Sequence, residues 1–158
     1  MANTQSMCTS FMSELMTATH NFGTAPVRAA STADTFKAAL YLASATINAS
    51  TTAYTATGEV TGTGYTAGGV AVTNATAPTS TNTSSTAGTA YWTPSASITY
   101  TSVTLTTAFD CVLIYNSTQS NKAVSVHTFG SQTVTAGTFT LTMPSNTTST
   151  ALLRLATT

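Results

Sequence analysis

The sequence predicts a mainly β protein, an antiparallel β-sandwich of about eight or nine strands with one N-terminal amphipathic α-helix. Three observations support this prediction. Thr occupies about a quarter of the positions, apolar and polar residues alternate along the C-terminal half, and apolar residues recur at helical spacing near the start. β-Branched residues such as Thr suit strands, because their substituted Cβ atoms pack well on a pleated surface.

Residues 6–22 predict an amphipathic helix of about four turns. Ser6 can cap its N-terminus, and apolar residues follow at spacings of three and four: Met7, Cys8, Phe11, Met12, Leu15 and Met16. Methionine adapts to irregular surfaces, so this face either packs on the chain's own domain or docks on a neighbouring subunit. We therefore expect an attachment arm over residues 1–23 and a β-sandwich domain over residues 24–158.

The middle of the chain predicts short strands separated by loops. Alternating apolar residues at 34–44 predict a strand, although Ala and Leu there also suit a helix. Residues 51–60 form either a strand or an ordered loop. The four glycines within residues 62–69 predict turns before a short strand at 70–72. Residues 74–88 are rich in Thr, Ser and Asn and predict an exposed, mobile loop.

A short strand at 89–93 holds the single Trp of the chain. Trp92 is interpreted as a core or subunit-contact residue rather than as a sugar-stacking platform formed with Tyr91. The segment 97–105 alternates next, but its apolar parity changes from Ile98 to Val103, which predicts a bulge near residues 101–102.

Four strand-like segments follow at 109–115, 122–129, 138–143 and 151–155. Glycines bound residues 130–137 and predict a turn there, so the four segments would form a β-meander. This meander is the predicted nucleus of the core. The residues expected to be buried in it are Cys111, Leu113, Val124, Val126, Phe139, Leu141 and Leu153.

The low number of charged residues favours a protein that is part of an assembly. With four acidic and four basic residues the net charge is zero, which favours association over free monomers. Scattered basic residues exclude a nucleic-acid partner. No basic segment followed by an apolar run indicates a signal peptide, and no apolar stretch reaches the length of a membrane span.

No residue pattern predicts an active site, a metal site or a cofactor. The glycine-rich segment lacks the Gly-Lys-Ser/Thr of a phosphate-binding loop. Ser125, His127 and Asp110 could suggest a hydrolase, but no glycine elbow presents the Ser, and His127 is interpreted as a hydrogen-bonded sheet residue. His20 and His127 have no Cys, Asp or Glu at metal-ligand spacing. A disulfide between Cys8 and Cys111 stays open, although Cys111 is more simply a core residue.

Several segments carry a resemblance to a known group of proteins. They are DTFKAALY at 34–41, TTAYTATGEV at 51–60, GTGYTAGG at 62–69, NKAV at 121–124 and LRLA at 153–156. On these segments the chain resembles small virion structural proteins of tailed bacteriophages, from about residue 34 onward.

The resemblance implies a non-enzymatic protein present in many copies on the virion surface and made in the host bacterial cytoplasm. It implies most directly a capsid decoration, or cement, protein that binds the major capsid protein and neighbouring copies of itself as a homo-oligomer. Alternatives are a receptor- or carbohydrate-binding module of a tail or head fibre, or another head–tail structural component. The residues expected at the capsid or subunit contact are Met7, Phe11, Met12, Leu15, Met16, Phe22, Tyr65 and Trp92.

Overall fold

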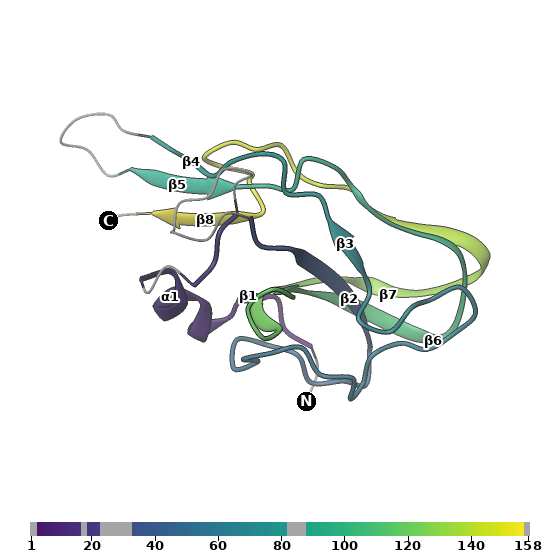
Figure 1. The fold of residues 1–158 in the computed structure, drawn as a ribbon. Coiled ribbons are helices and arrows are strands. Elements are labelled where there is room, and N and C mark those ends of the chain that lie inside the picture. Colours follow the sequence, from purple (N-terminus) through teal and green to yellow (C-terminus); the bar gives the residue numbers. More distant parts are fainter. Residues whose placement is uncertain (1–2, 17–18, 23–32, 82–87, 157–158) are drawn as a thin grey trace.

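The computed structural model describes residues 3–16, 19–22, 33–81 and 88–156, and this part of the chain is mainly β and antiparallel (Figure 1). The elements in chain order are β1 (Ser6–Met7), α1 (Thr9–Met16), β2 (Phe36–Leu42), β3 (Val70–Val72), β4 (Thr79–Ser80), β5 (Thr89–Trp92), β6 (Ile98–Asn116), β7 (Lys122–Leu141) and β8 (Leu153–Ala156). A five-stranded sheet has the order β1-β7-β6-β2-β3, and a three-stranded sheet has the order β4-β5-β8.

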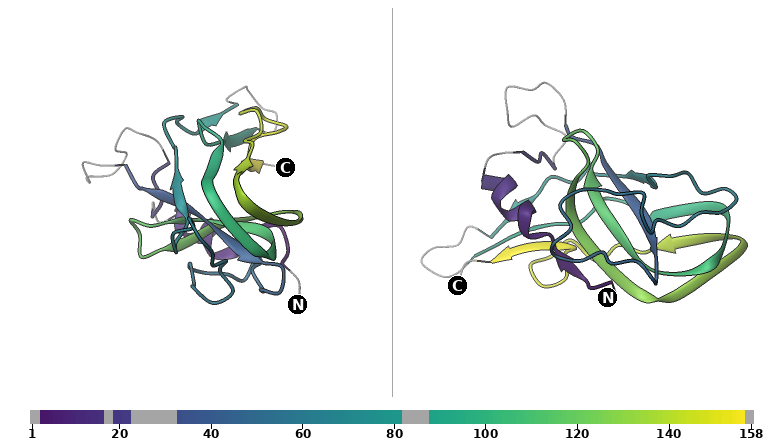
Figure 2. Two further views of the ribbon diagram at one scale, coloured as in Figure 1. Left: turned by 90° about the vertical axis from the view of Figure 1, so that its right-hand side faces the viewer. Right: turned by 90° about the horizontal axis from the view of Figure 1, so that it is seen from below.

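The two longest strands, β6 and β7, have 19 and 20 residues and pair along nearly their whole length. Both curve strongly in Figure 2. The curvature has a local cause, because the register shifts at several points, the first of them between Tyr100 and Val103. Ser102 lies at this shift with a φ of 53°. The bulge predicted near residues 101–102 is therefore confirmed.

The predicted four-strand meander is wrong in two respects. Residues 130–137 form no turn, because β7 runs through them and pairs with β6 at Leu105–Val134 and Phe109–Gln132. Bulges in β6 absorb the irregularity, and the left-handed φ in this segment belongs to Ala136, not to a glycine. The last strand, β8, pairs with β5 in the small sheet and not with β7.

The predicted four-turn helix over residues 6–22 is also wrong in extent. The helix α1 has eight residues, and Ser6 and Met7 instead pair with Val126 and Ser125 of β7. The amide of Cys8 continues this ladder with a hydrogen bond of 3.1 Å to the carbonyl of Val124. Residues 19–22 are not helical. Pairing with an available strand edge thus outweighs the helical spacing of the apolar residues.

Other predicted segments agree more closely with the structure. Strands occur as predicted at β2, β3 and β5. Residues 51–60 are an ordered loop with isolated bridges, such as Ala53 with Lys122. The predicted mobile loop at 74–88 contains β4, and its residues 82–87 lie outside the described part of the chain.

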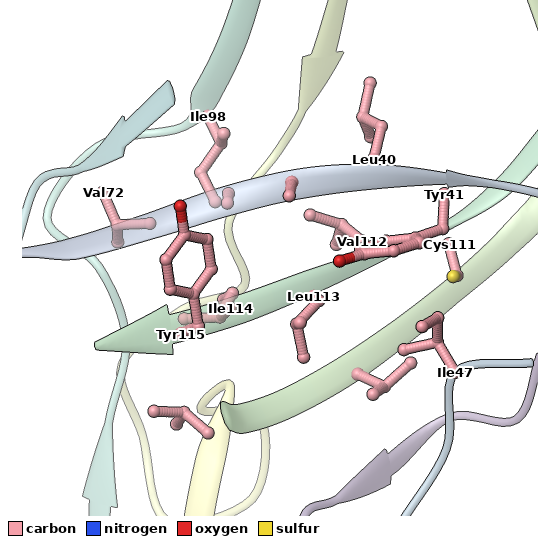
Figure 3. Close-up of a cluster of buried hydrophobic side chains, with 14 of the residues drawn as sticks. Leu40, Tyr41, Ile47, Val72, Ile98, Cys111, Val112, Leu113, Ile114 and Tyr115 are labelled. Atoms are coloured by element: carbon pink, nitrogen blue, oxygen red, sulfur yellow. The ribbon is translucent and has the colours of Figure 1, made fainter. Parts of the chain in front are cut away.

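One cluster of buried side chains forms the core, and most of its members lie on β2, β6 and β7 (Figure 3). Of the residues predicted to be buried, five are buried and two, Phe139 and Leu141, pack partly buried against the core; the buried five are Cys111, Leu113, Val124, Val126 and Leu153. Cys8 and Cys111 are both buried free thiols. Burial raises the pKa of Cys8 to about 11 and that of Cys111 to about 12.

An aromatic cluster joins the small sheet to the large one. The ring of Phe22 stacks on Phe36 of β2 with centroids 4.5 Å apart, and it meets Trp92 of β5 edge-on at 4.7 Å. Phe11 of α1 contacts Phe22 at 5.7 Å. Because aromatic burial contributes strongly to packing energy, this cluster fixes α1 beside the small sheet.

The turn before β3 yields a stability prediction at Gly69. Gly69 has a φ of +71°, and a Cβ there would overlap the carbonyl oxygen of Ala38. We expect Gly69→Ala to lower the free energy of unfolding by about 2–3 kcal/mol, measured by urea denaturation. Gly130→Ala is the matched control, because a Cβ at Gly130 meets nothing within 4 Å. Equal denaturation midpoints for the two variants would contradict the strain at Gly69.

Candidate functional site

An apolar groove lies between α1 and the small sheet, on the side of the molecule where Figure 1 shows both elements. Its volume is about 110 Å³, and it is lined by Met7, Phe11, Leu15, Phe22, Pro78, Ala90, Tyr91, Trp92, Leu153 and Leu155. Leu155 is 41% exposed, the most exposed large apolar side chain among the described residues. The groove thus presents a small apolar surface with an exposed leucine in its lining.

The groove brings together five of the eight residues predicted to make subunit contacts: Met7, Phe11, Leu15, Phe22 and Trp92. Phe11, Phe22 and Trp92 form its buried floor, whereas Met7 and Leu15 are half-buried at its wall. The side chains of Met12 and Met16 lie outside the described part of the structure. Tyr65 lies elsewhere. The contact role of all eight residues stays a prediction.

A polar network holds the N-terminal segment against β7 and thereby positions one wall of the groove. The carboxylate of Glu14 in α1 accepts hydrogen bonds of 2.7 Å from Nζ of Lys122 and from Nε2 of His20. Lys122 is the first residue of β7. An ion pair and a hydrogen bond thus join α1 to the sheet. Water has little access to them, because Glu14 and His20 are buried.

Asn116 and Asp34 extend this network of hydrogen bonds. The amide nitrogen of Asn116 donates to Asp34 at 2.8 Å and lies 3.1 Å from Nδ1 of His20. Asp34 also accepts hydrogen bonds from the backbone amide of Asn21 at 2.8 Å and from the side chain of Gln119 at 3.0 Å. The network thus connects the segment after α1, the start of β2 and the β6–β7 turn.

The titration state of the network follows from these contacts. Burial alone would raise the pKa of Glu14, but hydrogen bonds from Lys122 and His20 outweigh it and lower that pKa. Burial lowers the pKa of His20 and outweighs the opposing effect of Glu14. His20 is therefore neutral near pH 7, with Nε2–H donating to Glu14 and Nδ1 accepting from Asn116.

A third buried carboxylate, Glu59, explains the position of Tyr65. Glu59 accepts hydrogen bonds from the hydroxyls of Tyr54 at 2.6 Å and Tyr65 at 2.7 Å, and from the amide of Gly68 at 2.8 Å. The Tyr65 oxygen also accepts from the amide of Leu40 at 3.0 Å. Burial and the Glu59 contact raise the pKa of Tyr54 to about 12. These bonds hold the glycine-rich loop on the sheet and point to a structural role for Tyr65.

Ser125 and His127 lie on one face of β7 beside a second cavity. Their side chains are hydrogen-bonded, with Oγ of Ser125 2.9 Å from Nε2 of His127. Within the described residues no carboxylate is hydrogen-bonded to His127, and Asp110 instead accepts a hydrogen bond of 2.6 Å from Asn3. Burial lowers the pKa of His127 to about 4, which makes its imidazole a weak base. His127 is a hydrogen-bonded sheet residue, as predicted.

The sequence reasoning missed the network around Glu14 and the cavity beside Ser125. Residues as distant as Glu14 and Lys122 cannot be paired from sequence alone. Glu14 itself was a usable signal. The chain has only four acidic residues, and one that lies among apolar residues at helical spacing needs a buried partner.

Comparison with protein-family models, with curated proteins and with solved structures found no match to this chain. Within residues 3–16, 19–22, 33–81 and 88–156, no helix is long and apolar enough to cross a membrane. In the same residues, no group of three or more His, Cys, Asp or Glu side chains is placed to hold a metal ion.

The partly buried imidazole of His127 predicts a loss of stability in acid. The unfolded chain titrates near pH 6.5, whereas the folded pKa is about 4, so between these values the unfolded chain binds more protons. The free energy of unfolding should therefore fall by about 3 kcal/mol between pH 7 and pH 4 on account of His127.

Urea denaturation across this pH range checks the prediction. The free energy of unfolding of His127→Gln should depend less steeply on pH, because only the contributions of His20 and the carboxylates remain. Ser125→Ala keeps the imidazole and should keep the steeper dependence. An unchanged pH dependence in His127→Gln would show that His127 is not held neutral.

Proposed function

We propose that this protein is a non-enzymatic structural component of a tailed-phage virion, most specifically a capsid decoration protein that binds the major capsid protein. The observation that carries the proposal is the apolar groove between α1 and the small sheet, which unites most of the residues expected at a subunit contact. The resemblance in residues 34–156 suggests that the protein belongs to a phage particle, and the groove offers a surface for attachment to the capsid.

The anchoring of α1 supports a binding role. A docking surface is most effective when its parts are held in place before binding, because less conformational entropy is then lost. The Glu14–Lys122 pair and the His20 contacts hold α1 in this way on the sheet. Many copies on one particle would let modest affinities add up to strong retention.

The absence of net charge is also consistent with this function. A neutral surface rich in small hydroxyl groups offers many local hydrogen bonds and few long charged side chains to immobilise. In this proposal the two sheets are the two layers of a β-sandwich, in contact through Phe22, Phe36 and Trp92.

The alternative of a carbohydrate-binding module receives less support. It would use Trp92 as a stacking platform, but Trp92 is 2% exposed and its Nε1 donates a hydrogen bond of 2.8 Å to the carbonyl of Thr76. A sugar ring needs an open aromatic face.

Substitution at the rim of the groove tests the proposed function. Deleting the N-terminal segment would be a poor test, because Cys8, Phe11 and Phe22 belong to the core. Leu155→Asp changes an exposed residue, so folding should be retained. We expect it to weaken attachment to purified capsids at least about tenfold, since burying a Leu contributes about 1.5–3 kcal/mol.

The measurement is the number of copies bound per capsid at graded protein concentrations. Ala71→Asp on β3 is the control, because Ala71 is also exposed but lies on the edge strand of the other sheet. Wild-type protein that fails to bind capsids would refute the proposed function. Equal binding by Leu155→Asp and Ala71→Asp would exclude the groove as the attachment surface.

A further inference from the structure

The strand β8 is an edge of the small sheet, and within the described residues no strand pairs with its outer side. The edge strand β1 of the large sheet lines the same cleft as β8. Unpaired strand edges present backbone donors and acceptors to any extended chain that approaches them. This cleft has a volume of about 460 Å³.

The cleft differs in chemistry from the apolar groove. It is lined by Gln5, Ser6, Met7, Thr89, Ser125, Val126, His127, Thr148, Leu152, Leu153, Arg154 and Ala156. The lining contains hydroxyl, amide and guanidinium donors but no carboxylate. Arg154 is exposed and makes no ion pair with any described residue. A cleft with one cation and no anion is complementary to an acidic group.

Residues of β8 line both cavities. Of the two, Leu155 lines only the apolar groove, Leu152, Arg154 and Ala156 line only the polar cleft, and Leu153 lines both. Successive residues of a strand point to opposite faces, so Leu155 points to the face opposite Arg154 and Ala156. Leu153 and Met7 border both cavities, which makes them parts of one continuous surface.

We infer that the free edge of β8 binds an extended segment of a partner protein in which apolar and acidic residues alternate. The segment adds a strand to the small sheet, and its backbone pairs with β8. Its apolar side chains enter the groove beside Leu155, and the acidic side chain between them reaches Arg154 in the cleft. The inference rests on the proposed function, and it names the kind of capsid segment that the attachment surface takes.

Two capped synthetic peptides test the inference in the isolated protein: Thr-Leu-Glu-Leu-Thr and Thr-Leu-Lys-Leu-Thr. Trp92, the single Trp of the chain, lines the groove and reports binding by its fluorescence. We expect the Glu peptide to bind about 1.5- to fivefold more tightly than the Lys peptide, the range for an exposed charge pair.

Arg154→Glu should reverse this preference, which general damage to the fold would not do. Lys37→Glu makes the same change in net charge on β2 and should keep the wild-type preference. No saturable change in Trp92 fluorescence with either peptide, or an unchanged preference in Arg154→Glu, would overturn the inference.

Capsid binding separates this inference from the proposed function. Arg154→Glu should decorate capsids less well than wild type and than Lys37→Glu. If wild type decorates capsids and Arg154→Glu does so equally, the proposed function stands and the inference about β8 is wrong. If the peptides bind with the expected preference but wild type does not decorate capsids, the β8 site stands and the capsid assignment is wrong.

Discussion

The pairing of β6 with β7 is the interaction on which the rest of this structure depends. These strands carry much of the core, and each lies beside another strand of the large sheet, β2 on β6 and β1 on β7. Their bulges bend the pair, which runs from the Tyr100–Phe139 partners at one end to the Asn116–Lys122 partners at the other. Both the N-terminal network and the Ser125 cleft are built on β7.

Charge scarcity shapes the remaining contacts. All four acidic residues, Glu14, Asp34, Glu59 and Asp110, accept side-chain or backbone hydrogen bonds inside the structure. Three of these carboxylates are buried. Removing one partner from such a group leaves a buried charge unpaired, which costs more than the bond itself contributes. The acidic groups thus serve as internal connections.

Local pattern was sufficient to predict strand character but not strand extent or pairing. The alternation at residues 138–143 was visible, yet its continuity with residues 122–129 depends on the opposite strand, which bulges to keep the pairing. The parity change near Ser102 was a purely local signal, and the bulge there could be predicted. The spacing of Met7 and Phe11 suggested one long helix, but the free edge of β7 recruited Ser6 and Met7 as a strand.

The candidate site was predictable in part for the same reason. An apolar face near the N-terminus identified Phe11 and Leu15, because amphipathicity is a property of a short segment. The other wall of the groove comes from β5 and β8, which are distant in sequence and meet only after folding. The cleft at Arg154 had no signal in sequence, since its lining comes from β1, β5, β7 and β8, which are distant in sequence.

A three-dimensional reconstruction of purified particles tests the central claim most directly, namely that the groove between α1 and the small sheet is the attachment surface. The account predicts many copies on the shell, each with Leu155 and the edge of β8 against a capsid subunit. Copies that face the shell with the Glu59 loop, or with any other surface that leaves the groove in solvent, would contradict it.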